Sequence, residues 1–153
     1  MDSPIVELVF RRQPSAVIPE HRPLYKISQL ALILNVSSRA GRSKVSRLHL
    51  LNWALKKRSR QLLLERAAES GTLRIQAWGF DPILAFAIRF ALADGIVADT
   101  STGYELTEKG RSFAMAILKD PTLLASDKVF LERIGKGITE TMVDAVANDW
   151  DIR

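Results

Sequence analysis

Cysteine is missing from this sequence, and its absence removes several kinds of chemistry. Without thiols the chain can form no disulfide, no thiolate metal site and no cysteine nucleophile. A chain free of cysteine also suits the reducing cytosol, so we expect a cytoplasmic protein.

Long apolar stretches are missing as well. The longest, ILAFAIRFALA at residues 83–93, is interrupted by Arg89 and is shorter than the ~20 residues that cross a bilayer. The run IVELVF at residues 5–10 contains Glu7 and is too short for a signal peptide. We therefore expect neither a membrane span nor a secretory leader.

Motifs for catalysis or cofactor binding are also lacking. His21 lies in a proline-rich stretch and His49 in a leucine-rich one, and neither has a nucleophile or an acid arranged around it. A single histidine on an apolar helix is more often structural than catalytic. The eight glycines form no phosphate-binding loop, and metal-ligand spacing is absent. We expect a protein without enzymatic activity and without catalytic, cofactor-binding or metal-binding residues.

The composition itself is that of an ordinary globular domain, with 47% hydrophobic and 25% charged residues. The net charge of +5 is unevenly distributed. Residues 1–60 carry 12 basic and 3 acidic side chains, whereas residues 61–153 carry 10 basic and 14 acidic ones. This asymmetry suggests two surfaces with different partners, although basic side chains can also serve only to solvate helices.

Hydrophobic periodicity and turn residues predict a mainly α-helical chain with a small β-sheet. The expected strands and helices are, in order, a strand at 5–10, a proline-rich arm at 11–23, helices at about 28–37 and 43–58 with a continuation to Gly71, a strand at 73–78, a helix at 82–94, a hairpin at 96–106, and helices at about 108–118, 122–134 and 139–150.

The stretch VADTSTGYELTEKGRSF at residues 97–113 is typical of the wing of a winged-helix domain. Two short strands flank a polar loop that ends in Gly103, and Thr107 is placed to cap the next helix. The helix at 82–94 has Asp81 as its N-cap and Gly95 as its stop. It occupies the place of the recognition helix in the winged-helix plan.

This helix and wing are nevertheless poor candidates for reading DNA bases. The helix carries Arg89 as its only basic residue, so it is either buried nearly all round or packed against another protein. The wing tip at 99–103 has an acid and no lysine or arginine. We expect no sequence-specific DNA binding through this face.

The basic half contains the candidate nucleic-acid-binding residues. Clusters of lysine and arginine with interleaved serine suit phosphate contacts without base specificity. The candidates are Arg39, Arg42, Lys44, Arg47, Lys56, Lys57, Arg58 and Arg60. For the second cluster, a favourable interaction with a helix C-terminus is an equally simple explanation.

The two ends of the chain contain the candidate partner-binding residues. The strand at 5–10 is apolar on both faces and needs a partner, and the last helix carries an apolar stripe. The candidates are Ile5, Val6, Leu8, Phe10, Met142, Val143, Val146 and Trp150. The alternative for the last helix is that its stripe packs on its own domain.

Four runs of residues resemble the small middle component of bacterial ABC three-component systems, which include the Lamassu anti-phage defence systems. They are RPLYKISQLALIL (22–34), SRLHLLNWALK (46–56), WGFDPILAFAIRFALADGIV (78–97) and GYELTEKGRSF (103–113). The resemblance implies a winged-helix subunit that acts as an adaptor between an SMC- or Rad50-like ATPase and an effector, often a nuclease.

Together these patterns predict an N-terminal strand and arm at 1–23, a winged-helix domain at 24–119 and a helical extension at 120–153. The expected function is that of an adaptor whose acidic and apolar half binds protein and whose basic half contacts DNA held by the ATPase. The alternative is a winged-helix transcription regulator that binds DNA directly as a homodimer.

Overall fold

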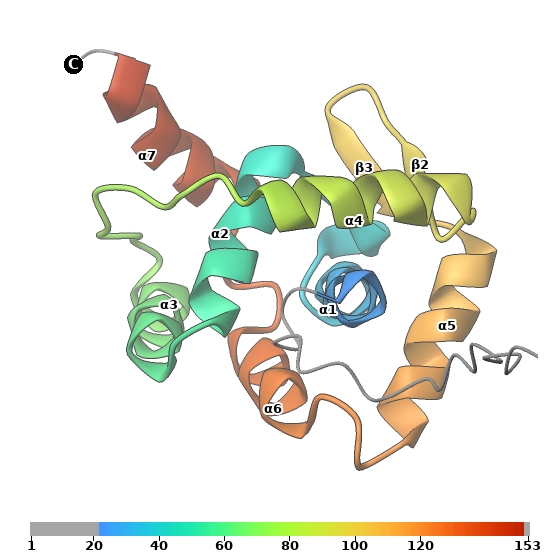
Figure 1. Ribbon diagram of the computed structural model, residues 1–153. Helices are drawn as coiled ribbons and strands as arrows, with labels where there is room; N and C mark the ends of the chain where they lie inside the picture. The colour runs from blue at the N-terminus through green and yellow to red at the C-terminus, as the bar shows by residue number, and fades with distance from the viewer. Residues whose placement is uncertain (1–21, 152–153) are drawn as a thin grey trace, which may run out of the picture.

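The computed structural model describes residues 22–151, which form a helical body with a small sheet on one side (Figure 1). Its helices are α1 (Pro23–Val36), α2 (Val45–Leu55), α3 (Arg58–Ser70), α4 (Pro82–Ala93), α5 (Glu108–Lys119), α6 (Ala125–Ile134) and α7 (Glu140–Asp151), with a short 3₁₀ turn η2 (Arg39–Gly41). The expected strand at 5–10 lies outside the described residues, as does most of the arm.

Helix α1 forms the centre of the body. Figure 1 shows it end-on, surrounded by the other helices, and it contacts α2, α4, α5 and α6. The run LALIL at residues 30–34 is at most 1% exposed. A helix that is apolar on every side is stable in water only when neighbours cover all of it, which explains its central place.

The three strands form one antiparallel sheet in the order β1-β3-β2, with β1 (Arg42–Lys44), β2 (Val97–Asp99) and β3 (Gly103–Leu106). Ser43 pairs with Tyr104, and Asp99 pairs with Tyr104 from the other side. A Cβ atom at Gly103 would lie 2.2 Å from the carbonyl oxygen of Ser43, so only glycine allows β1 to approach this closely.

The capping residues behave as the sequence predicts. The Asp81 side chain accepts a hydrogen bond from the Ile83 N–H, and the Thr107 hydroxyl accepts one from the Gly110 N–H. Gly71 and Gly95 both have positive φ and follow the ends of α3 and α4. The predicted hairpin is confirmed, and the chain is mainly helical with a small sheet.

Three local predictions are wrong. Residues 73–78 form no strand: they lie between α3 and α4 outside the three-stranded sheet, with Leu73 and Trp78 buried and the Trp78 Nε1 donating to the Ser46 carbonyl. The predicted helix from 43 to 71 is two helices, since Lys57 adopts an extended conformation between α2 and α3. Residues 42–44, predicted as a loop and helix start, form β1.

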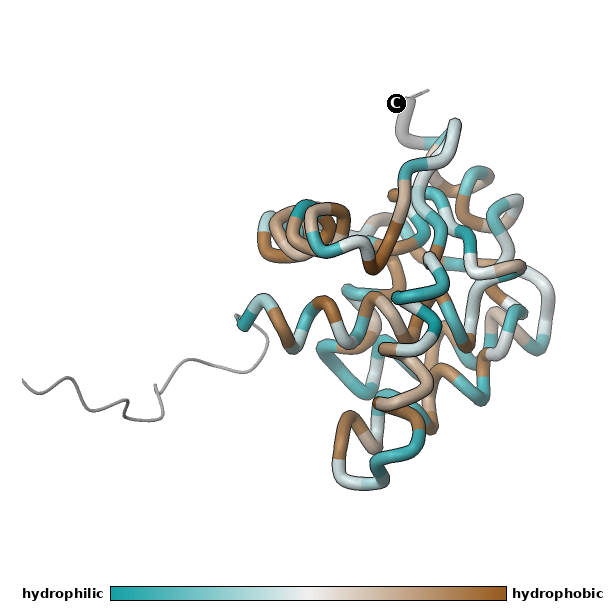
Figure 2. Tube along the Cα trace, turned by 90° about the vertical axis from the view of Figure 1, so that its right-hand side faces the viewer, coloured by the Kyte–Doolittle hydropathy of each residue, from teal (hydrophilic) through white to brown (hydrophobic). Residues whose placement is uncertain are grey.

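Figure 2 shows α4 nearly end-on at the margin of the molecule, with α1 running below it. Apolar residues lie on more than one side of α4, so not all of them can face α1. Among residues 22–151 no helix is long and apolar enough to cross a membrane.

Candidate interaction surfaces

Helix α4 buries one face and leaves an aromatic face exposed. Its buried residues are Leu84, Ala87, Ile88 and Ala91. On the outer side, Phe86 is 58% exposed and Phe90 is 53% exposed, and Phe80 just before the helix is 71% exposed. The expectation that the helix is buried nearly all round is therefore wrong. Its alternative, packing against another protein, stays a prediction.

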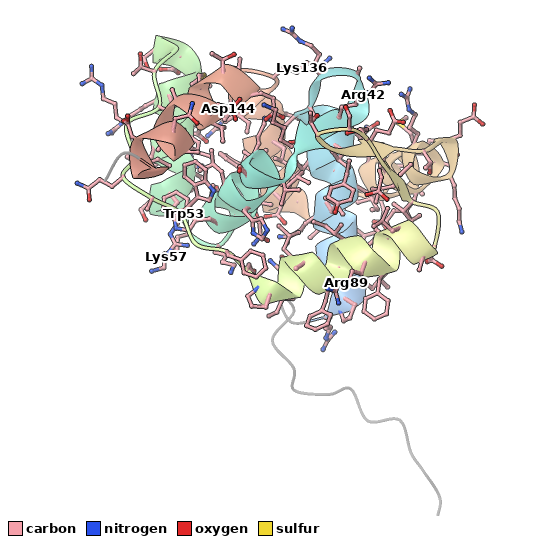
Figure 3. All side chains as sticks on the ribbon, turned by 90° about the horizontal axis from the view of Figure 1, so that it is seen from above. Arg42, Trp53, Lys57, Arg89, Lys136 and Asp144 are labelled. Atoms are coloured by element: carbon pink, nitrogen blue, oxygen red, sulfur yellow. The ribbon has the colours of Figure 1, made fainter. Side chains whose placement is uncertain are left out.

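Arg89 completes this surface, which we call the α4 aromatic face (Phe80, Phe86, Arg89 and Phe90). Its guanidinium lies 5.9 Å from the centre of the Phe86 ring, and Figure 3 shows Arg89 on the outer side of α4. A shallow cavity of about 190 Å³ lies between Phe80 and Phe86. Exposed apolar patches with a polar rim are typical of binding sites, and aromatic and arginine side chains dominate many interfaces.

Asp81 holds the start of α4 against α2. One carboxylate oxygen caps the helix, and the other accepts hydrogen bonds from Lys56 Nζ and Asn52 Nδ2, both at 2.9 Å. Burial by itself raises the pKa of this carboxyl. The hydrogen bonds from Lys56, Asn52 and Ile83 and the charge of Lys56 together outweigh burial and lower the pKa to about 2.

His49 belongs to the same buried network. Its Nδ1 accepts a hydrogen bond from the Asp81 N–H at 3.2 Å, and its ring lies 4.8 Å from the Phe80 ring. Burial lowers the pKa of His49. A neutral imidazole that accepts a backbone hydrogen bond orients the segment before α4, which is a structural role.

Arg47 is the clearest correction among the predicted nucleic-acid-binding residues. It is 3% exposed, and its guanidinium donates to the carbonyl of Ile138 at 2.6 Å, to the hydroxyl of Ser38 at 2.8 Å and to the carbonyl of Ser37. Burial lowers its pKa, and the charge of Glu140 opposes this effect. With its donors directed at protein oxygens, Arg47 is not a surface phosphate ligand.

Most of the other predicted basic residues have acidic or aromatic partners. Lys44 pairs with Asp144, Arg42 with Glu105, Lys56 with Asp81 and Arg58 with Glu65, all within 3.0 Å. Arg60 stacks over the Trp53 ring at 4.6 Å. Arg39 and Lys57 are exposed, and no ion pair forms at either within residues 22–151.

The two predicted basic clusters do not form one surface. They flank the 11-residue helix α2, which at ~1.5 Å per residue keeps them roughly 16 Å apart. Figure 3 shows Arg42 and Lys57 at well-separated places. The structure instead brings Arg39 and Arg42 together with Lys136, which lines the same cavity of about 330 Å³. Sequence reasoning missed Lys136 because it is almost a hundred residues away along the chain.

The apolar stripe of α7 packs mainly on its own domain. Val143 is fully buried, which contradicts its assignment to a partner-binding surface, and Met142 and Val146 are half-buried against the same core. Helix α7 contacts α2. The candidates Ile5, Val6, Leu8 and Phe10 and the side chain of Trp150 lie outside the described residues.

Comparison with known proteins gives no relative: no family model, no curated protein and no solved structure matches the chain. Within residues 22–151 no group of three or more His, Asp or Glu side chains is arranged to hold a metal ion. Function is therefore proposed from the sequence resemblance and from the α4 aromatic face.

Proposed function

We propose that this protein is a winged-helix adaptor without catalytic activity, a cytoplasmic subunit of an SMC- or ABC-type ATPase complex in anti-phage defence. In this role it bridges the ATPase and an effector nuclease, as the resemblance of residues 22–118 implies. The observation that carries the proposal is the α4 aromatic face.

The winged-helix assignment is supported by the order of elements. A first helix, a short strand, a second helix, the α4 helix and a hairpin follow one another, and the sheet order β1-β3-β2 places the hairpin strand in the middle. Helix α3 and the segment 71–81 are then an insertion before α4. In such a plan α4 takes the position of the helix that DNA-binding relatives of the fold insert into the major groove.

The chemistry of α4 favours protein over DNA as its partner. Base edges and phosphates are recognised by hydrogen-bond donors and acceptors, whereas Phe86 and Phe90 offer neither. Fully burying a large apolar side chain contributes about 1.5–3 kcal/mol. Because Phe86 and Phe90 are 58% and 53% exposed, covering the rest of each would contribute roughly half of that, and two such side chains can anchor a protein interface. The partner expected here is an apolar groove or pocket on the ATPase or the effector.

A second docking element is expected at the N-terminus. The predicted strand at 5–10 carries apolar residues on both faces, namely Ile5, Val6, Leu8 and Phe10. Adding this strand to a sheet of a larger subunit would bury these side chains and pair the backbone N–H and C=O groups of the strand. This remains a prediction from the sequence. Met142 and Val146 are a weaker second choice, since both are partly buried against the core of their own domain.

The test is a pull-down of the ATPase and effector with the full chain, after checking that genes for an ATPase and a nuclease lie beside this one. The variant Phe86→Ser/Phe90→Ser should lose at least one of the two subunits. The matched control Met115→Ser/Val129→Ser changes two apolar residues on α5 and α6 that are 46% and 51% exposed, and it should retain both subunits.

Thermal melting of both variants should match that of the original chain, so that a lost interaction is not lost folding. Normal assembly by the α4 variant would overturn the proposal. Selection of a defined palindromic DNA site by a homodimer would instead favour the transcription regulator.

A further inference from the structure

Four of the nine residues that line the cavity beside η2 are cations, and they come from separate parts of the chain. Arg39 begins η2 and Arg42 directly follows it, Lys136 comes from the link between α6 and α7, and Arg47 lies at the buried side of the cavity. Arg39, Arg42 and Lys136 are exposed. Figure 3 shows Arg42 and Lys136 near each other, on the side of the molecule away from Arg89.

Arg47 fixes the position of these cations. Its hydrogen bonds to Ile138 on one side and to Ser37 and Ser38 on the other tie the α6–α7 link to the turn that carries Arg39. The link itself is tightly packed, because a Cβ atom at Gly137 would lie 2.8 Å from the Cβ of Ala68 on α3. The exposed guanidinium and ammonium groups therefore extend from a rigid base.

The N-terminus of α7 adds to the positive potential. Thr139 caps the helix by accepting the Met142 N–H at 3.2 Å, and Thr139, Glu140 and Thr141 all line the cavity. The first turn of a helix presents unpaired N–H groups and a partial positive charge. Four cations and a helix N-terminus thus converge on one cavity.

Two carboxylates oppose this potential without cancelling it. Among the described residues, Glu140 is the only acid that lines the cavity. One of its oxygens accepts the Lys44 N–H at 3.0 Å, and the other has no hydrogen-bond partner within residues 22–151. Glu105 pairs with Arg42 in an exposed ion pair, which salt and competing ligands can displace readily. The cavity retains an excess of positive charge.

The basic surface continues past Lys136 into a second cavity. This neighbouring cavity has a volume of about 180 Å³ and is lined by Lys136, Arg111 and the backbone of Ala40–Gly41, among others. Two adjoining cationic cavities that share Lys136 fit successive phosphates of a backbone better than one free anion. None of the described residues that line the first cavity is aromatic, so stacking of unpaired bases finds no support.

We propose that Arg39, Arg42, Arg111 and Lys136, which we call the η2 basic surface, bind the phosphate backbone of duplex DNA without reading its sequence. Phosphate contacts of this kind position a protein on DNA but carry no base information. The inference is independent of the adaptor proposal, because it uses a different face of the molecule and different residues.

The test measures binding of the full chain to a fluorescent random-sequence DNA duplex over a series of salt concentrations. The variant Arg39→Gln/Lys136→Gln should bind more weakly, and the slope of log K against log salt should become flatter by about 1.8, or ~0.9 per lost phosphate contact. The control Arg74→Gln/Lys119→Gln removes the same net charge from exposed sites elsewhere and should leave the slope unchanged.

Three results would overturn the inference. The original chain could fail to bind the duplex at low salt, both variant pairs could weaken binding equally through net charge alone, or single strands could bind more tightly than the duplex. The outcome is separable from that of the adaptor test. Phe86→Ser/Phe90→Ser should leave the salt slope unchanged, and Arg39→Gln/Lys136→Gln should still capture the protein partners.

Discussion

The α4 aromatic face and the η2 basic surface are built in opposite ways. The aromatic face comes from one short stretch, residues 80–90, in which helical spacing brings Phe86 and Phe90 together and Phe80 lies just before the helix. The basic surface comes from η2, β1, α5 and the α6–α7 link, which only the fold brings together. An exposed apolar face can thus be encoded locally, whereas this cluster of cations depends on topology.

Each surface also depends on one buried polar side chain behind it. Asp81 fixes the start of α4 to α2, and Arg47 fixes the two segments that carry Arg39 and Lys136. Asp81 and Arg47 should therefore contribute to the stability of the fold, whereas an exposed residue of the aromatic face should contribute little. Measuring the stability of variants at these positions distinguishes the residues that hold a surface in place from those that are free to bind a partner.

The largest expected effect is that of Arg47→Ala. The carbonyls of Ser37 and Ile138 would lose their donor, and each buried polar group left unsatisfied costs about 1–3 kcal/mol, so we expect a loss of about 3 kcal/mol or more in unfolding free energy. Urea denaturation measures this. The control Arg39→Ala, at an exposed site, should change it by about 0.5 kcal/mol at most.

A different result would restore the original interpretation of Arg47. If Arg47→Ala left stability unchanged and weakened DNA binding, this arginine would be a phosphate ligand after all. The basic surface would then extend to residues that the structure places in the interior.

The next largest effect is expected for Asp81→Ala, at about 2 kcal/mol, because α4 loses its N-cap and Asn52 and Lys56 lose their acceptor. The pKa of Asp81 is about 2 in the folded chain against 3.8 in the unfolded chain. Its ionised form therefore stabilises the fold fully above pH 3.8, and this contribution is lost as the pH falls towards 2.

Urea denaturation at several pH values checks this. The difference in stability between the original chain and Asp81→Ala should shrink between about pH 4 and pH 2. Asp81→Asn is the matched control, since an amide can still cap the helix but does not titrate. A difference that is independent of pH across this range would show that the charge of Asp81 contributes nothing.

The smallest expected effect on stability is that of Phe90→Ser. The side chain is 53% exposed, so its loss should change the free energy of unfolding by about 0.5 kcal/mol or less. Thermal melting of both variants measures this: the neighbouring change Ile88→Ser, at a site 4% exposed on the inner face, should destabilise the fold strongly. Similar melts for the two variants would mean that α4 has no distinct outer face.

Some of the structure could be predicted because the decisive residues are close together in the chain. Asp81 with Pro82, Thr107 with Gly110 and the turn at Gly103 act over a few residues, and α4, α5 and the hairpin form where the pattern places them. The strand predicted at 73–78 fails for the opposite reason. Its alternating pattern matches a strand, but a strand also needs a neighbouring strand within reach, and the fold instead places this segment between α3 and α4 with Leu73 and Trp78 buried.

For the candidate sites too, the sequence could predict which residue types are present but not where the fold places them. Composition could identify an apolar, aromatic α4 with a single arginine, yet it could not say which side of the helix remains exposed. It could identify a basic half, yet Arg47 and Lys57 look alike in the sequence although one is buried and the other exposed.

By itself, then, the sequence determined the mainly helical class, the caps, the hairpin at 97–106 and the unequal distribution of charge, because each follows from short-range backbone preference or from counting. Only the tertiary structure decided that Val143 lies in the core, that Arg47 is an internal tie and that Lys136 and Arg111 join Arg39. Burial and the convergence of charges depend on which distant segments pack together, and that is set by the whole core.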